Sequence, residues 1–421
     1  MKIIKSKKIK TVEIFKRKRN FQPDNWSVVP LKSICNLING MAFKPSDWSE
    51  DGLEIIRIQN LNGSNIFNYY NKEDYKDRNV VLNNDLLFAW SGSIGTSFGP
   101  YLWCGKKALL NQHIFKVEMI NSYDNEFYKK WFYFYLKDIE KRVEADAHGG
   151  GGLVHVKKGT MENYNISLPS IDEIENIATA LSQQEDQVNK IKTLIEKLEK
   201  RNQYYAERLL SGELRVREGD DGKVEFYENT EWREIKDGNE TKLIPTTWNK
   251  DSLGDLVSVT TGKKNANAGS EKGSYKFFTC SKEDKRIESY SFDQEAILIA
   301  GNGVVGLSKY YNGKFDAYQR TYILGGFKIN GKYLFSFINR KFQKAIEKEI
   351  KGGVISYIKL ENITDFEVLY PNSDSELKLL ITSINNINLE LNQAKVILEK
   401  EQKRFDWMSD ALLSGEYQIV D

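Results

Sequence analysis

The chain has 421 residues, a formal net charge of +2 at pH 7, 40% hydrophobic residues and 29% charged residues. This length allows two or three domains with hydrophobic cores, and the composition is ordinary for a globular protein. No apolar run approaches the ~20 residues of a membrane-spanning helix, and the N-terminus lacks the apolar core of a signal peptide, so we expect a cytoplasmic protein that does not engage a membrane.

The first 24 residues form a basic lead-in, with nine Lys or Arg and a single acid among the first twenty. Such a segment is either a phosphate-binding arm or a solvated tail, and the tail is favoured. A first block then occupies residues 25–170, with Gly40 fourteen residues after Trp26. Its expected elements, in chain order, are a strand at 54–58, a polar loop at 59–65, apolar strands at 84–95 and 111–119, an aromatic-rich helix at 127–143 and a last strand at 165–170.

A long helix is expected at residues 171–212. From Ile174 to Leu209, apolar residues recur at alternating intervals of three and four, without proline or glycine. This period of about 3.5 residues is typical of a coiled-coil seam. A charged linker with at most two short strands follows at 213–242. The remaining segments are a second block (243–372), a second long helix (373–415) and a C-terminal tail (416–421).

The second half of the chain repeats the first. Trp248 and Gly262 are again fourteen residues apart, a proline precedes both tryptophans, and both helices end in LLSGE. The expected fold is therefore α+β: two pseudo-twofold-related domains of mixed β structure with short helices, separated by two long helices. Two copies in one chain favour internal pairing of the helices, as an antiparallel coiled coil, over dimerisation.

The seam between the two helices is expected to contain Ile174, Leu181, Val188, Ile195, Leu209, Leu377, Ile384, Leu391, Leu398 and Leu412. Gln184, Asn202 and Tyr205 also fall on seam positions. The two amides would fix the register at some cost in stability.

The sequence contains no recognisable catalytic motif. It lacks the GxxxxGK[ST] phosphate loop and the Asn-Pro-Pro-aromatic motif of amino-methyltransferases. A GxGxxG match at 301–306 is followed by turn and strand residues instead of a helix, and the HGGG run at 148–151 has no GxSxG partner. Three cysteines and three histidines are too dispersed for a disulfide framework or a zinc site. We therefore expect no catalytic residue, no metal site and no cofactor on this chain.

Polar residues in the glycine-rich loops of both blocks are the best candidates for DNA contacts. In a major groove, Arg and Lys can address guanine and Asn or Gln can address adenine, while other polar groups hold phosphates. The alternative is that these loops are polar only because they are exposed. The candidates are Ser91, Ser93, Lys106, Lys107, Gln112 and His113 in the first block, and Lys263, Lys264, Asn302, Lys309, Gln319 and Arg320 in the second.

The length of the helices suggests a ruler. About forty residues with a rise of ~1.5 Å span roughly 60 Å. Two blocks that far apart would contact DNA about one to two turns of ~34–36 Å apart. This geometry predicts a bipartite DNA site with an unread spacer.

From about residue 26 to residue 416, the chain resembles the DNA-specificity subunits of type I restriction-modification systems. The resemblance rests on the duplicated layout of block and helix, on Pro169 and Pro371 where each strand gives way to a long helix, and on the two LLSGE ends. It implies that each block is a target recognition domain for one half of an asymmetric site, and that the helices set the spacer. The basic lead-in is not explained by it.

The resemblance also implies the partners. These are double-stranded DNA, two DNA methyltransferase subunits that modify an adenine in each half-site, and two restriction (motor-nuclease) subunits. S-adenosylmethionine, ATP and Mg would then be bound by those partners, and exposed lysines of the first helix, Lys192, Lys197 and Lys200, would face them.

Three other functions stay open at this point. One is a methyltransferase or restriction enzyme with its own recognition domain, which the missing motifs oppose. Another is a two-lobed coiled-coil scaffold that binds proteins and has no DNA role. The third is the specificity subunit of a related, type II-like methyltransferase-nuclease.

Overall fold

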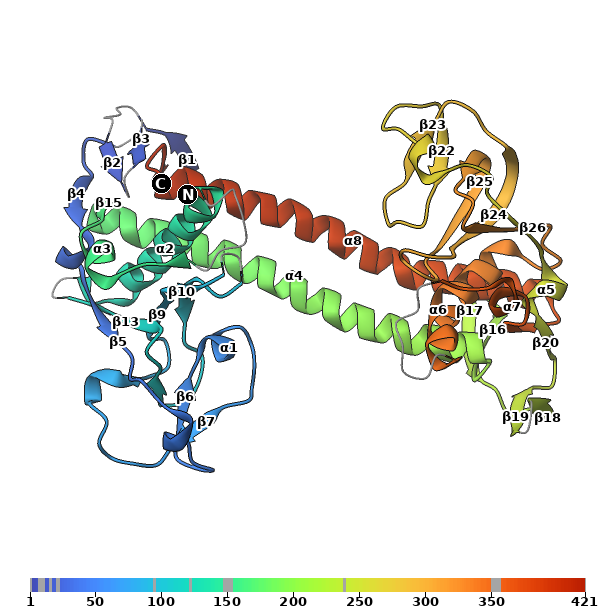
Figure 1. Cartoon of the computed structure of the whole chain (residues 1–421), viewed down its shortest axis with the longest axis horizontal. Helices are drawn as coiled ribbons and strands as arrows, with labels where there is room; N and C mark the ends of the chain where they lie inside the picture. Colours follow the sequence, from blue (N-terminus) through green and yellow to red (C-terminus); the bar gives the residue numbers. More distant parts are fainter. Residues whose placement is uncertain are drawn as a thin grey trace. The chain divides into compact units, whose positions relative to one another are not determined.

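The structure is a computed structural model. It describes every residue except 1, 7–11, 15–16, 20–22, 94–95, 121–122, 147–153, 238–239, 350–356 and 421. The chain forms two compact units: unit 1 comprises Met1–Thr193 and Val396–Asp421, and unit 2 comprises Leu194–Lys395. Two long helices, α4 (Ile171–Ser211) and α8 (Asp374–Leu413), each contribute one half to each unit (Figure 1). In the described part of the chain, no helix is both long and apolar enough to cross a membrane.

Unit 1 contains two four-stranded sheets. One has the order β11 (Gly99–Leu102), β9 (Leu86–Ala89), β13 (Ile114–Met119) and β5 (Cys35–Asn39). The other has the order β7 (Asn68–Tyr70), β6 (Leu53–Ile56), β12 (Ala108–Leu110) and β8 (Val80–Val81), and β12 runs parallel to β6. Unit 1 also contains short antiparallel pairs, among them β4 (Ser27–Pro30) with β15 (Asn165–Leu168), and β10 (Ser91–Gly92) with β14 (Val154–His155).

The helices of unit 1 supply much of its core. They are α1 (Ile58–Leu61), α2 (Glu126–Asp146), α3 (Lys158–Glu162) and the short 3-10 turns Leu31–Ser33, Pro45–Asp47 and Asp77–Asn79. Helix α2 buries Trp131, Phe132 and Tyr135 completely, which explains its aromatic-rich sequence. Helix α1 begins at Ile58, the last residue of the strand expected at 54–58, and continues into the polar loop expected at 59–65. The side chain of Asn60 is buried there and accepts a hydrogen bond from the N–H of Arg57.

Unit 2 contains a six-stranded sheet in place of the two smaller ones. Its order is β21 (Ser258–Thr261), β26 (Thr321–Gly325), β24 (Phe292–Ala300), β25 (Ser308–Ala317), β22 (Tyr275–Phe278) and β23 (Lys285–Ile287), with β22 parallel to β25. Strand β20 (Trp248–Ser252) pairs with β27 (Glu367–Pro371). The helices are α5 (Leu253–Leu256), α6 (Gly331–Glu349), α7 (Leu360–Thr364) and the 3-10 turn Ala266–Ala268.

The segment 213–242 corrects one expectation, because it contains more than two short strands. Strand β16 (Leu214–Glu218) pairs with β17 (Val224–Glu228), and β18 (Trp232–Asp237) pairs with β19 (Glu240–Pro245). Leu214 and Val216 are buried in the core of unit 2. The high charge of the segment is compatible with strands because one face of a two-stranded hairpin stays in solvent.

The described part of the basic lead-in is also folded, which corrects the expectation of a solvated tail there. Strand β1 (Lys2–Lys5) pairs with β28 (Tyr417–Val420), and β2 (Val12–Ile14) pairs with β3 (Arg17–Arg19). Strand β28 follows the end of α8 as β16 follows the end of α4, and the pairs β1–β28 and β2–β3 match the pairs β16–β17 and β18–β19. The lead-in and the tail are therefore parts of the internal repeat.

Helices α4 and α8 pair antiparallel within each unit. In unit 1 the amide of Gln184 donates to the Glu401 carboxylate at 2.8 Å, and in unit 2 the amide of Asn202 donates to the Ile387 carbonyl at 2.8 Å. Eight of the ten expected seam residues are buried, and Leu391 and Leu398 are half-buried. Tyr205 is 38% exposed, so its assignment to the seam was wrong. The α+β class with two repeated domains and two long paired helices is confirmed.

The two LLSGE sequences end the long helices in the same way. Gly212 and Gly415 adopt φ angles of +75° and +76°, which favour glycine and end a helix. A Cβ at Gly212 would overlap the ring of Pro245, and a Cβ at Gly415 would overlap the ring of Pro23. The repeated glycine and the repeated proline are thus one packing contact, present once in each unit.

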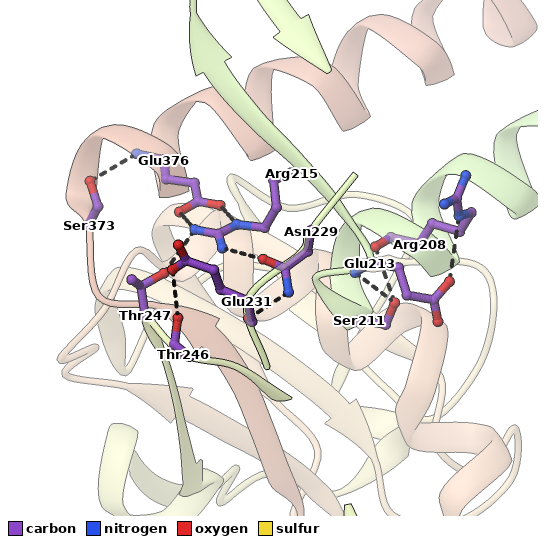
Figure 2. A network of polar contacts seen from close by, with 10 residues as sticks. All are labelled: Arg208, Ser211, Glu213, Arg215, Asn229, Glu231, Thr246, Thr247, Ser373 and Glu376. Carbon is purple, nitrogen blue, oxygen red and sulfur yellow. Dashed lines mark hydrogen bonds and ion pairs between the residues drawn. The ribbon is translucent and has the colours of Figure 1, made fainter. Parts of the chain in front are cut away.

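An acid near the start of each long helix is hydrogen-bonded to the strand that follows the other helix, but the partners differ. In unit 2 the guanidinium of Arg215 forms a bidentate ion pair with Glu376, and also donates to Asn229 at 3.1 Å and Thr247 at 3.0 Å (Figure 2). Arg215 and Glu376 are 7% and 8% exposed. Burial opposes the charged form of Arg215, but the ion pair outweighs it and raises the pKa of the guanidinium.

The equivalent acid in unit 1 is Glu173, and its described partners are neutral. Gln418 donates to one carboxylate oxygen at 2.7 Å, and the indole of Trp26 donates to the other at 3.0 Å. Asn25 and Ser170 add donors at 2.7 and 3.0 Å. Gln418 therefore occupies the place that Arg215 has in unit 2.

Candidate nucleic-acid interface

Five of the predicted contact residues lie together in unit 2. We call Lys263, Lys264, Asn302, Gln319 and Arg320 edge 2. A tight turn joins β25 to β26, closed by a 2.8 Å bond from the Thr321 N–H to the Tyr318 carbonyl, and Gln319 and Arg320 are its two central residues. The N–H of Gln319 donates to the Lys264 carbonyl at 2.9 Å, and the N–H of Gly301 donates to the Arg320 carbonyl at 2.9 Å.

Gly262 makes this arrangement possible. A Cβ at this position would overlap the carbonyl oxygen of Ala317, at the end of β25. The absence of a side chain lets the segment that carries Lys263 and Lys264 pass against the turn. On the other side, Asn302 pairs with Tyr357 as an isolated β-bridge, and the N–H of Ile358 donates to the Gly301 carbonyl at 2.9 Å.

Hydrogen bonds hold the backbone of edge 2 in place, whereas its side chains are available for contacts with another molecule. Within the described residues, none of the five side chains makes a hydrogen bond or an ion pair. Lys263, Gln319 and Arg320 are exposed, and the other two are half-buried. Polar side chains on a preorganised backbone suit a surface that reads another molecule, because little backbone entropy is lost on binding.

Lys309 lies apart from edge 2, and its ammonium is engaged within the fold. It donates to the carbonyls of Ser281 and Lys282 at 2.9 Å and to Asp284 at 2.6 Å. Lys276 donates to the other oxygen of Asp284 at 3.2 Å. Partial burial opposes ionisation of Asp284, but the two lysines outweigh it and lower the pKa of this carboxyl. Lys309 thus braces the loop at 281–284.

Unit 1 has an edge with the same backbone frame. We call Met41, Ala42, Ser91, Gln112 and His113 edge 1. Gln112 and His113 are the central residues of a turn that the Ile114 N–H closes onto the Asn111 carbonyl at 3.2 Å. The N–H of Trp90 donates to the His113 carbonyl at 3.3 Å, as Gly301 does to Arg320 in unit 2. A Cβ at Gly40 would overlap the Asn111 carbonyl, as one at Gly262 would overlap that of Ala317.

The side chains on the two frames differ in charge. Met41 forms the bridge to the first turn residue that Lys264 forms in unit 2, and His113 stands where unit 2 has Arg320. The His113 ring is half-buried and lies 5.3 Å from the ring of Trp90, and its Nε2 is 3.3 Å from the Gln112 amide. The segment after the glycine and the turn therefore carry three Lys or Arg residues in edge 2 and none in edge 1.

The other three candidates of the first block are not part of edge 1. Ser93 is exposed, and its N–H donates to the Ser97 hydroxyl at 2.8 Å in the turn after β10. Lys106 and Lys107 are exposed and precede β12, whereas Asn111 follows it. Three strand residues with a rise of ~3.3 Å separate the two sites by about 10 Å.

Arg57 and Gln59 lie beside edge 1, at a place for which the sequence predicted no contact residue. They line a hollow together with Asn111 and His113. The Arg57 guanidinium donates to the Asn68 side chain at 3.0 Å and lies 5.4 Å from the ring of Trp48. The internal repeat gives no signal for them, because the offset that carries Trp26 onto Trp248 carries Arg57 onto Thr279 and Gln59 onto Ser281.

The described residues contain no group of three or more His, Cys, Asp or Glu side chains that could hold a metal ion. The three cysteines are free, with Cys35 and Cys280 buried and Cys104 exposed. Burial raises the pKa of Cys35 to about 12, which disfavours its reactive thiolate.

Comparison with known proteins gives one consistent result. A family model described as the type I restriction modification DNA specificity domain matches residues 23–200 and 245–395. The specificity subunit of the type I restriction enzyme EcoDI from Escherichia coli is 37% identical over 157 residues, 37% of this chain and 35% of that protein. The EcoBI specificity subunit from the same species is 25% identical over 238 residues, 56% of this chain and 47% of that protein. The matches thus span about a third and about half of these two relatives.

A third relative matches over nearly its whole length. The MjaVIII specificity subunit of Methanocaldococcus jannaschii is 23% identical over 433 residues, 94% of each protein. Among solved structures, the type I restriction-modification S subunit from M. genitalium superposes with a TM-score of 0.58 at 17% identity, over 94% of this chain and 97% of that one. A chain from a structure of type I R-M complex assembly gives a TM-score of 0.54 at 13% identity, over 94% and 99%. These two structures share the fold.

Proposed function

The chain belongs to the family of type I restriction-modification DNA specificity proteins, and from this premise we propose that it directs such a system to a bipartite, asymmetric DNA sequence. Its relatives are named specificity subunits of restriction enzymes, and a specificity subunit recognises DNA while other subunits carry out the chemistry. Each unit would bind one half-site in double-stranded DNA.

The observation that carries this proposal is the pair of edges. Edge 1 and edge 2 share three backbone features. A glycine passes against the turn, the turn has two central residues, and an N–H donates to the carbonyl of the second of them. The two edges differ in the side chains that face outward. Two surfaces with one frame and different side chains suit the recognition of two half-sites with different sequences.

The long helices would set the unread spacer between the half-sites. Helix α4 has 41 residues and α8 has 40. At a rise of ~1.5 Å per residue, each spans roughly 60 Å. Inserting four residues into both helices should lengthen the spacer and leave both half-sites unchanged. Altered half-sites would refute this role of the helices.

The catalytic steps would belong to partners. We propose two DNA methyltransferase subunits that modify an adenine in each half-site with S-adenosylmethionine, and two restriction subunits that use ATP and Mg. The absence of a recognisable methyltransferase or nucleotide-binding motif supports this division.

Methylome sequencing tests the proposal. A strain that expresses this chain together with its methyltransferase should acquire one new adenine-methylated motif, made of two different half-sites and a fixed unread spacer. A continuous motif, or none, would contradict the proposal. The methyltransferase expressed without this chain is the control, and should methylate no specific motif.

A further inference from the structure

We propose that Arg320 reads a guanine in the half-site bound by unit 2, and that unit 1 reads its half-site without an equivalent cationic contact. This inference rests on the proposed function. It goes further by naming one residue, one base and one half-site.

The first argument is the way in which Arg320 is held. Its carbonyl accepts hydrogen bonds from the Gly301 N–H at 2.9 Å and the Cys280 thiol at 3.3 Å. Its side chain is exposed and, within the described residues, makes no hydrogen bond or ion pair. The backbone of this arginine is therefore positioned, while its five N–H donors are available to a ligand.

The second argument is the chemistry of its surroundings. A guanidinium offers two parallel donors that match N7 and O6 of guanine in the major groove. Lys263 and Lys264 lie beside the turn, and Gln319 precedes Arg320 in it. Lysines suit phosphate contacts that position a protein on DNA, and an amide suits adenine. Edge 2 thus combines two lysines suited to DNA phosphates with two side chains, Gln319 and Arg320, suited to bases.

The third argument is the contrast with unit 1. The turn position of Arg320 is occupied there by His113, whose ring lies against Trp90 and Gln112. The nearest arginine of the hollow, Arg57, is held by Asn68 and lies over Trp48. Neither His113 nor Arg57 therefore offers a free guanidinium to edge 1.

The test compares three variants in the complete complex with its methyltransferase. In Arg320→Ala, one G·C position in one half-site should become degenerate, with discrimination against other bases reduced by about 5- to 150-fold. The second half-site and the spacer should stay unchanged. In Lys263→Ala, the motif should stay intact and binding should weaken equally for all sequences.

Lys332→Ala is the matched control. Lys332 is an exposed cation at the start of α6, which β26 separates from the turn, so its loss should alter neither motif nor affinity. A motif that Arg320→Ala leaves unchanged, with binding weakened for all sequences, would overturn the inference and make Arg320 a phosphate contact. If the unmodified chain gave no bipartite motif, the proposed function would fail instead.

Discussion

Unit 1 and unit 2 share backbone features at equivalent positions, but they differ in the side chains at the start of each long helix and at the edges. Both keep the glycine that ends the long helix, the proline packed against it and the glycine that crosses the recognition turn. They diverge at the acid that opens each helix, which meets Arg215 in unit 2 and Gln418 in unit 1. They diverge again at the edges, which contain three Lys or Arg residues in unit 2 and none in unit 1.

The comparison shows which positions a duplicated chain can change. A Cβ at Gly40 or Gly262 would meet backbone atoms, which cannot move aside, so either substitution disturbs the frame itself. Arg320 and His113 project from a turn whose backbone is held independently of their side chains. Recognition can therefore change at these positions without altering the fold.

The largest expected effect concerns the two acids. Glu376→Gln leaves the buried guanidinium of Arg215 without its counter-charge, and should lower the free energy of unfolding by about 3–5 kcal/mol. Glu173→Gln removes a charge whose described partners are all neutral, and should cost about 1 kcal/mol. Urea unfolding of the full chain, followed by tryptophan fluorescence, measures both. Equal losses in the two variants would contradict the contrast between the junctions.

The next effect concerns the glycines of the edges. Gly262→Ala and Gly40→Ala should each lower the free energy of unfolding by about 1–3 kcal/mol, because the new methyl group overlaps a backbone carbonyl. Each should also abolish binding to its own half-site. Gly159→Ala is the control: a Cβ there meets no atom within 4 Å, and alanine favours the helix. Thermal unfolding and DNA binding measure the two effects. A Gly262→Ala or Gly40→Ala variant with unchanged stability and unchanged DNA binding would contradict the prediction.

A smaller effect concerns the loops beside the edges. Lysines lower the pKa of Asp284, so its contribution to stability is complete above the ordinary carboxyl pKa of about 3.9 and is lost as the pH falls through the lowered value. The equivalent loop in unit 1 depends on the uncharged Asn60. At acid pH, and after correction for intrinsic rates, hydrogen exchange of the backbone amides should become faster in residues 281–284 but not in residues 57–61. Lys309→Met should loosen the first loop at neutral pH as well.

The smallest effect concerns salt. Lys264→Ala should reduce the slope of log K against log salt by about 0.9, because one phosphate contact is lost. Met41→Ala and Ala42→Gly in unit 1 should leave the slope unchanged. Titrations of the assembled complex with its target DNA would settle this, and an unchanged slope for Lys264→Ala would remove that lysine from the interface.

The sequence predicted what depends on local period and on repetition. The spacing from Ile174 to Leu209 predicted α4, and the paired Trp and Gly residues predicted the duplication. It could not predict contacts that depend on distant partners. The charged segment that contains Arg215 resembles a linker in the sequence. Its buried ion pair with Glu376, 161 residues away, is seen only in the structure. The hydrogen bond from Lys309 to Asp284, 25 residues away, is likewise not indicated by sequence spacing.

If each edge reads one half-site independently, an exchange of side chains between the edges should change one half-site alone. A chain with Met41→Lys, Ala42→Lys, Ser91→Asn and His113→Arg would carry the outward groups of edge 2 on the frame of edge 1. Methylome sequencing should then show a changed half-site for unit 1, with the half-site of unit 2 and the spacer as before. An unchanged motif, or a change in the half-site of unit 2, would show that the two edges do not read their half-sites independently.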